Sequence, residues 1–371
     1  MSSAVSEAVP FLDLSDEFKA LEQEWIAAIR ATGKSGRFIL GDDVGLLEKE
    51  IAQYTGTAHA ISLANGTDAL TLSLRALDIG PGDEVITTPF TFFATAEVIS
   101  HVGATPVFAD INPDSFNLDP ESVRAKITAR TKAILPVHLF GNPTDMTAMM
   151  DIARESGLAV VEDSAQAFGA AWGEYKVGSM GDTGCFSFYP TKVLGCYGDG
   201  GMITTNREDI KDHLLRLRNH GAVKPFVHDE IGYNSRLDTI QASLLRVKLK
   251  KVDKDIRHRR EVAALYTELL KDTGVITPTL PDGGQHVFNL YTVRVKNRDQ
   301  ARQHLTDHNI ATSLCYPMPL HLQAVYKNLG YQPGDLPVCE QLAYEVLSLP
   351  VFPAMKKEQV KRVCEVLTST P

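Results

Sequence analysis

Between residues 59 and 205 the chain alternates short apolar segments with segments of helical periodicity. The apolar segments cover residues 59–64, 84–87, 106–111, 132–137, 158–161, 185–188 and 202–205. Strands that are apolar along most of their length and alternate with helices are typical of a mostly parallel sheet with helices on both faces. We therefore predict an α/β fold. Its ligands should bind beyond the carboxyl ends of the strands.

Helical patterns flank this region on both sides. Two amphipathic patterns precede it, at residues 16–31 and after Asp42, and a charged pattern at 238–273 follows it. Farther on, strand-like runs at 288–296 and 312–315, a helix at 298–308 and two C-terminal helical patterns indicate a smaller α+β unit. We predict a large domain at residues 1–250, which includes the N-terminal helical segment, and a small domain at 251–371 that contributes to the substrate site.

Composition and charge exclude several classes of protein. The 371 residues include 37 basic and 46 acidic side chains, so the net charge of −9 argues against nucleic acid as a partner. No run approaches the ~18 apolar residues that would cross a bilayer, and residues 1–10 lack a signal-peptide pattern, so we expect a cytoplasmic protein. Five cysteines without CxxC spacing predict neither a zinc site nor disulfides.

Two segments that follow strands could bind a ligand. Gly66 and Thr67 lie between a strand and a helix, where helical N–H groups and a hydroxyl form a ready anion site. A simple capped turn is the alternative interpretation. Phe92 follows the next strand, and its ring could stack on a planar ligand or pack into the core.

Later strands end in groups that can carry acid–base or nucleophilic chemistry. Burial of Glu162 and Asp163 would require a cationic partner, such as a protonated pyridine nitrogen, or hydrogen bonds. The pair could instead bind a metal ion, although no further ligand residue lies at suitable spacing. It could also form a solvent-exposed turn. Lys192 lies in a short loop before the glycines of 195–201. If the loop encloses it, its pKa should be lowered and its amine could attack an aldehyde; an exposed loop lysine is the alternative.

The glycines of this loop do not form a known nucleotide-binding fingerprint. The chain contains no GxxxxGK[ST] motif, and residues 195–201 do not fit GxGxxG after a strand. This argues against an oxidoreductase built on a dinucleotide-binding sheet.

The order and spacing of these motifs resemble the DegT/StrS-type nucleotide-sugar aminotransferases, a family of fold-type-I enzymes that depend on pyridoxal 5′-phosphate (PLP). The resemblance covers nearly the whole chain. It rests on the runs SGRFILG at 35–41, NGTDAL at 65–70, PGDEVI at 81–86, HLFG at 138–141 and NSRLD at 234–238, together with the acidic pair and the lysine loop. It implies the fold-type-I architecture, with a large PLP-binding α/β domain and a smaller C-terminal domain.

The resemblance also implies which residues contact the PLP ring. Lys192 would form the internal aldimine, and Asp163 would keep the pyridine nitrogen protonated so that the ring acts as an electron sink. Phe92 would stack on one face of the ring and Ala165 would pack against the other. Gln166 would reach the phenolic oxygen.

The implied phosphate site combines two subunits. Gly66, Thr67 and Ser187 would bind the phosphate with N–H and hydroxyl groups, and Asn234 would reach the phosphate of a neighbouring subunit. A homodimer with shared active sites would then be required. Tyr316 and His321 would lie near the substrate, although an ordinary loop histidine is an equal alternative for His321.

The implied reaction is ping-pong transamination. Glutamate would donate its amino group to the cofactor, with Lys192 moving the proton, and the amine would then pass to a keto-sugar of a nucleoside diphosphate. GYNSRLD at 232–238 and PLHLQ at 319–323 most resemble the branch that aminates C3 rather than C4. Val193, Glu97 and Asn289 depart from the family pattern and leave the shape of the sugar pocket open.

Two alternatives use the same scaffold. A PLP-dependent nucleotide-sugar dehydratase is disfavoured because that branch has histidine in place of Lys192. A PLP-binding regulatory protein without turnover is disfavoured because Lys192, Asp163 and Gln166 are all present.

Overall fold

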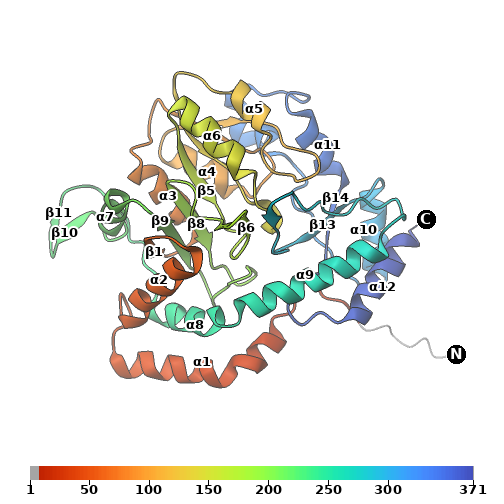
Figure 1. Ribbon diagram of the computed structural model, residues 1–371, viewed down its shortest axis with the longest axis horizontal. Coiled ribbons are helices and arrows are strands. Elements are labelled where there is room, and N and C mark those ends of the chain that lie inside the picture. Colours follow the sequence, from red (N-terminus) through yellow and green to blue (C-terminus); the bar gives the residue numbers. More distant parts are fainter. Residues whose placement is uncertain (1–7, 371) are drawn as a thin grey trace.

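A seven-stranded sheet lies at the centre of the protein in the computed structural model, which describes residues 8–370 (Figure 1). Its strands are β1 (His59–Leu63), β2 (Glu84–Thr87), β3 (Thr105–Phe108), β4 (Thr131–Leu135), β5 (Ala159–Asp163), β8 (Thr183–Ser187) and β9 (Gly201–Thr205). The spatial order is β1-β9-β8-β5-β4-β2-β3, and only β9 runs antiparallel to its neighbours. Each predicted apolar segment supplies one strand, so the mostly parallel sheet is confirmed.

Helices cover both faces of this sheet because successive side chains of each strand point to opposite sides. Val161 packs in a core with α3 (Gly66–Ala76), α4 (Ala94–His101) and α7 (Glu208–Leu217). Its neighbour Val160 packs in another core with α5 (Pro120–Ala125) and α6 (Met146–Ser156). α2 (Asp42–Thr55) and α8 (Thr239–Leu249) pack against Phe186 and Met202. α1 (Ser15–Ser35) lies along α8 (Figure 1).

The C-terminal part is built around the antiparallel pair of β13 (Tyr291–Arg294) and β14 (Val346–Leu349). Its helices are α9 (Val252–Leu269), α10 (Arg298–Asp307), α11 (Pro337–Glu345) and α12 (Lys357–Thr368), with short 3-10 turns η2 (Leu320–Leu322) and η3 (Ala324–Leu329). The strand predicted at 312–315 is reduced to a bridge between Ser313 and Ser348. β14 takes its place beside β13, because strand pairing depends on a distant partner that local periodicity does not specify.

The predicted domain boundary near residue 250 falls at the break between two helices. The helical pattern at 238–273 forms two helices, α8 and α9, separated at Lys250 and Lys251. At the other end of the chain, Val9 pairs with Ile310 and is buried in the core of the C-terminal part. This N-terminal segment therefore packs on the small unit, and the division at residue 250 stays a prediction.

Short strands lie outside the central sheet. β6 (Ala171–Trp172), β7 (Tyr175–Lys176) and β12 (Gly284–Gln285) form one small sheet. β10 (Ala222–Lys224) and β11 (Val227–His228) form a hairpin that projects from the body (Figure 1). Phe226, at its tip, is 97% exposed, and Ile231, just beyond it, is 87% exposed.

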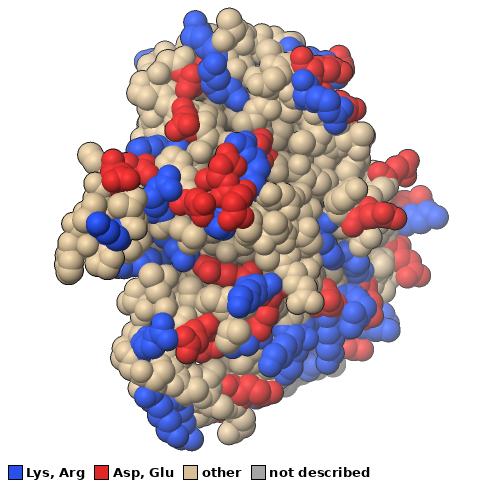
Figure 2. Space-filling model, turned by 60° about the vertical axis from the view of Figure 1, so that its left-hand side comes forward, with Lys and Arg blue, Asp and Glu red and all other residues tan. Residues whose placement is uncertain are grey.

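Charged side chains of both signs are interspersed on the face drawn in Figure 2, with uncharged areas between them. Across residues 8–370, none of the helices combines the length and apolar character that a membrane-spanning segment needs.

Candidate active site

A cavity of about 500 Å³ lies at the carboxyl ends of β1, β2, β5 and β8. Parallel strands bring these ends to the same edge of the sheet, and each is followed by a segment that lines the cavity. The structure places nine residues named from the sequence in its wall: Gly66, Thr67, Phe92, Asp163, Ala165, Gln166, Ser187, Lys192 and Tyr316.

Asp163, the last residue of β5, is a buried carboxylate in this wall. Its Oδ2 accepts a hydrogen bond from the Thr95 hydroxyl at 2.8 Å, and its Oδ1 accepts one from the Ala165 N–H at 3.1 Å. Burial raises the pKa of Asp163, while these hydrogen bonds and the positive charge of Lys192 act in the opposite direction. A cation bound in the cavity would therefore favour the ionised carboxylate.

Lys192 lies in the turn after β8, where its N–H donates to the Tyr189 carbonyl at 2.9 Å. Desolvation by the surrounding protein lowers the pKa of Lys192, partly offset by the charge of Asp163. The lysine side chain thus has more of the neutral, nucleophilic amine near neutral pH than an exposed lysine has.

The N-terminus of α3 provides donors at another side of the cavity. Asn65 caps this helix by accepting from the Asp68 N–H at 2.8 Å. The N–H groups of the first helical turn, at Gly66 and Thr67, have no intrahelical partners and favour an anion. A Cβ on Gly66 would lie 2.7 Å from the Ser187 Cβ, so only glycine lets the helix approach this serine so closely.

Gln166 is held in one orientation by two contacts. Its Oε1 accepts from the Phe140 N–H at 2.9 Å, and its Nε2 donates to the Tyr316 hydroxyl at 3.0 Å. Phe140 has a φ of 59°, a left-handed conformation that is unfavourable for a residue with a Cβ. The strained HLFG turn therefore fixes Gln166 and leaves one of its two amide hydrogens for a ligand.

The sequence matches the model of the DegT/DnrJ/EryC1/StrS aminotransferase family over residues 19–368. The chain belongs to this family. The aminotransferase is 48% identical over 360 residues to a "pleiotropic regulatory protein" of Geobacillus stearothermophilus, covering 96% of this chain and 97% of the relative. It is 44% identical over 363 residues to the UDP-N-acetyl-3-dehydro-alpha-D-glucosamine 3-aminotransferase of Acidithiobacillus ferrooxidans, with 98% of both chains covered.

A solved structure shares its fold as well. The crystal structure of S. venezuelae DesV in complex with a ketimine intermediate superposes with a TM-score of 0.96 at 41% identity, covering 98% of each chain. The fold-type-I architecture and the family that the sequence resembles are thereby confirmed, and the protein is a PLP-dependent transaminase.

The cavity of this aminotransferase has the groups that PLP requires. Asp163 is a buried carboxylate that lacks a directly bonded cation among the described residues, which suits a protonated pyridine nitrogen. Lys192 supplies the amine for the aldehyde, and the α3 N-terminus supplies N–H groups for the phosphate. Phe92, which is 60% exposed, also lines the cavity.

The structure does not bring Asn234 and His321 to the cavity of their own chain. Asn234 is exposed, and its Oδ1 accepts from Arg236 at 2.5 Å. His321 is buried, and its Nε2 lies 3.1 Å from Glu340 Oε1. Glu340 lies in α11 and also accepts from the Gly334 N–H, in the segment before this helix. Through Glu340, His321 therefore connects η2 to α11 and to that segment.

Two features of the aminotransferase site were not expected from the sequence. Thr95 contacts Asp163, yet a threonine in the first turn of a helix is too common to mark it as functional. A second cavity of about 240 Å³ adjoins Lys192 and is also lined by Asn289 and Cys315. The Oδ1 of Asn289 is buried without a hydrogen-bond partner among the described residues. Asn289 stands out in the sequence only as a departure from the family pattern.

Proposed function

We propose that this aminotransferase transfers the amino group of glutamate to C3 of a keto-sugar carried by a nucleoside diphosphate. The observation that carries the proposal is the joint placement of Lys192 and Asp163 in one cavity, with the N-terminus of α3 at its wall. A nucleophilic amine, a buried carboxylate and an anion site are the groups that PLP-dependent transamination needs.

The residues of the chain divide the work between holding the cofactor and moving protons. PLP, when bound, supplies the electron sink that stabilises negative charge at the substrate carbon. Asp163 would hold a proton on the ring nitrogen, and Phe92 and Ala165, which also line the cavity, would hold the ring between them. The Lys192 amine would take the proton from the α-carbon of the donor and deliver it to the imine carbon of the cofactor within the same half-reaction. In the second half-reaction it would carry a proton in the opposite sense, to the sugar carbon that receives the amine. Its lowered pKa suits this role as a base near neutral pH.

The choice of C3 rests on the sequence and on a relative. GYNSRLD at 232–238 and PLHLQ at 319–323 favour the C3 branch, and the Acidithiobacillus relative is named as a 3-aminotransferase. Tyr316 would lie near the sugar, since it lines both the cofactor cavity and the adjoining one. His321, the histidine in PLHLQ, would contribute indirectly, by holding the segment that contains it in position.

A homodimer is part of the proposal. Asn234 is exposed and outside the cavity of its own chain, as expected for a residue that reaches the phosphate site of a neighbour. The exposed apolar side chains of Phe226 and Ile231 lie in the same segment of the chain, and a partner subunit would cover them. A cytoplasmic location stays a prediction of the sequence.

Absorption spectroscopy of the purified holoenzyme tests the proposal in two steps. Addition of glutamate should remove the visible band of the bound cofactor and produce the near-ultraviolet band of its amino form. The amino form should then return to the visible-absorbing form with 3-keto sugars of UDP or dTDP, but not with the matched 4-keto sugars. A holoenzyme that does not respond to glutamate, or that responds only to 4-keto sugars, would contradict the donor or the C3 assignment, respectively.

A further inference from the structure

Glu162 precedes Asp163 on β5 and is not used by the chemistry described above. Its carboxylate is fully buried, and no Lys or Arg among residues 8–370 forms an ion pair with it. Successive side chains of a strand point to opposite faces, so Glu162 is directed away from the cavity that Asp163 lines. A buried carboxylate is costly unless hydrogen bonds compensate for the lost water.

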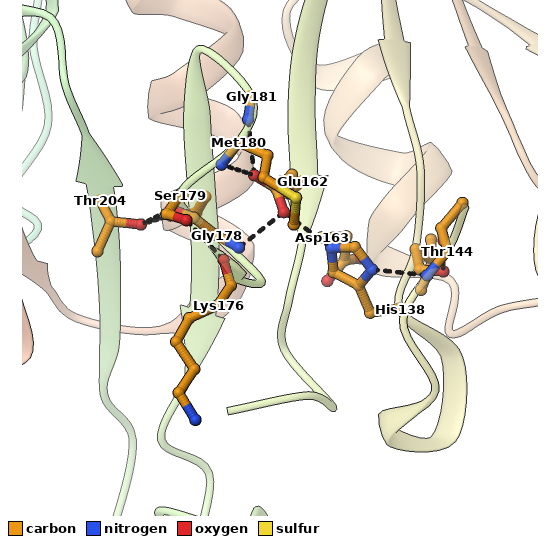
Figure 3. A network of polar contacts seen from close by, with 12 residues as sticks. His138, Thr144, Glu162, Asp163, Lys176, Gly178, Ser179, Met180, Gly181 and Thr204 are labelled. Atoms are coloured by element: carbon orange, nitrogen blue, oxygen red, sulfur yellow. Dashed lines mark hydrogen bonds and ion pairs between the residues drawn. The ribbon is translucent and has the colours of Figure 1, made fainter. Parts of the chain in front are cut away.

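Four N–H groups supply that compensation (Figure 3). Oε1 of Glu162 accepts from the N–H of Met180 at 2.8 Å and of Gly181 at 2.7 Å. Oε2 is 2.7 Å from the Gly178 N–H and 3.0 Å from Nε2 of His138. An ionised carboxylate offers about four acceptor positions, so all of them are used. Glu162 therefore ties β5 to the loop that precedes β8 and to the segment that follows β4.

The hydrogen bonds of His138 determine which of its nitrogens carries the proton. The ring is fully buried, and its Nδ1 lies 3.0 Å from the Thr144 N–H, which can only donate. Nδ1 is therefore the acceptor, and Nε2 bears the hydrogen that is donated to Glu162. His138 is thus a neutral donor in a single tautomer.

His138 also contacts Asp163 directly through the backbone. Its N–H donates to the Asp163 carbonyl at 3.0 Å, and the Asp163 N–H donates to the Pro136 carbonyl at 2.9 Å. One histidine therefore holds two successive residues of β5: Glu162 by its ring and Asp163 by its amide. These contacts fix the backbone of Asp163 at the end of β5. A charge-assisted hydrogen bond made by its carboxylate is sensitive to shifts of a fraction of an ångström.

We propose that His138 and Glu162 form a positioning pair that places the Asp163 carboxylate against the ring nitrogen of PLP. Neither residue touches the cofactor. The pair acts by anchoring the end of β5, and its effect is measured as cofactor affinity.

Two substitutions of His138 separate the two hydrogen bonds of its ring. His138→Asn introduces an amide oxygen that can replace Nδ1 as acceptor for Thr144, but no donor then reaches Glu162. His138→Gln introduces an amide nitrogen that can replace Nε2 as donor to Glu162, while Thr144 loses its acceptor. Apoprotein of each variant, alone and combined with Asp163→Asn, would be titrated with PLP, and circular dichroism would check its fold.

The expected result is a dissociation constant for PLP about tenfold higher in His138→Asn, from the lost hydrogen bond to a charged group. His138→Gln should stay within about threefold of the wild type. In the Asp163→Asn background, His138→Asn should have no further effect, because no carboxylate remains to be placed.

Three results would overturn the proposal: unchanged affinity in His138→Asn, equal weakening by both substitutions, or a weakening that persists in the Asp163→Asn background. Should His138→Asn fail to fold, Glu162→Gln tests the pair from its other member, because the amide has only one acceptor oxygen for the N–H groups of Met180, Gly181, Gly178 and His138. About a tenfold loss of PLP affinity in Glu162→Gln that disappears in the Asp163→Asn background supports the pair, and unchanged affinity contradicts it.

Discussion

Replacing Thr95 by valine removes a hydrogen bond to the buried carboxylate of Asp163 while keeping the shape of the side chain. The Thr95 hydroxyl lies 2.8 Å from Oδ2 of Asp163, and both residues are buried. A hydrogen bond to a charged group contributes about 1.5–3 kcal/mol net. At about 1.4 kcal/mol per tenfold change, the dissociation constant for PLP should rise by roughly 10- to 150-fold.

The substitution should weaken cofactor binding more than it destabilises the apoprotein. Burial raises the pKa of Asp163, so without a bound cation the carboxyl group is more readily neutral and depends less on a donor. Once the protonated ring nitrogen is bound, the carboxylate is ionised and the Thr95 hydroxyl stabilises its charge. The free energy of unfolding of the apoprotein should therefore change less than the free energy of PLP binding.

The assay is a titration of apoprotein with PLP, followed by absorbance, for the wild type, Thr95→Val and Thr95→Ser. Serine keeps the hydroxyl and its contact with Thr91, which lies 3.1 Å away, and loses only a methyl group. Thr95→Ser should therefore bind PLP within about threefold of the wild type. The reasoning fails if Thr95→Val binds as tightly as the wild type, or if the serine variant is as weak as the valine variant.

Further expectations concern the other groups of the site. Lys192→Ala should abolish the visible band and transamination while circular dichroism is unchanged; retained turnover would rule out its assigned role. Asp163→Asn should still bind PLP at saturating concentration but lose roughly 10²-fold or more in the rate of the glutamate half-reaction, and a wild-type rate would refute its charge role. Asn234→Asp should raise the dissociation constant for PLP about tenfold by charge repulsion with the phosphate, so unchanged retention on dialysis would count against its contact with the neighbouring site. Because burial lowers the pKa of Lys192 below 10.5, the neutral amine predominates at a lower pH than in an exposed lysine. The rate of PLP recombination with apoprotein should rise with pH and level off below pH 10.5, and a rate still climbing there would contradict the lowered pKa.

The strands of the central sheet could be predicted because each is a short apolar run between turn-forming residues, a property of the local sequence. The ends of the elements were less predictable: the run predicted at 158–161 extends to Asp163 in β5, which brings that carboxylate to the edge of the sheet. β14 was missed and a strand was predicted at 312–315 instead. The two segments lie beside each other at Ser313 and Ser348. Long-range packing decides which of them pairs with β13.

For the site, the sequence by itself determined the kinds of chemical group and the elements that carry them. A lysine after one strand, a carboxylate at the end of another and a glycine turn before a helix all follow from local pattern. Only the tertiary structure decided which groups meet. It brings Thr95 to Asp163, Gln166 to Tyr316 and His138 to Glu162, and it turns His321 toward Glu340 rather than into the cavity. The physical reason is that periodicity and turn residues reflect interactions over a few positions of the chain. The partner and burial of a polar side chain depend instead on packing between segments that are, for Gln166 and Tyr316, 150 residues apart.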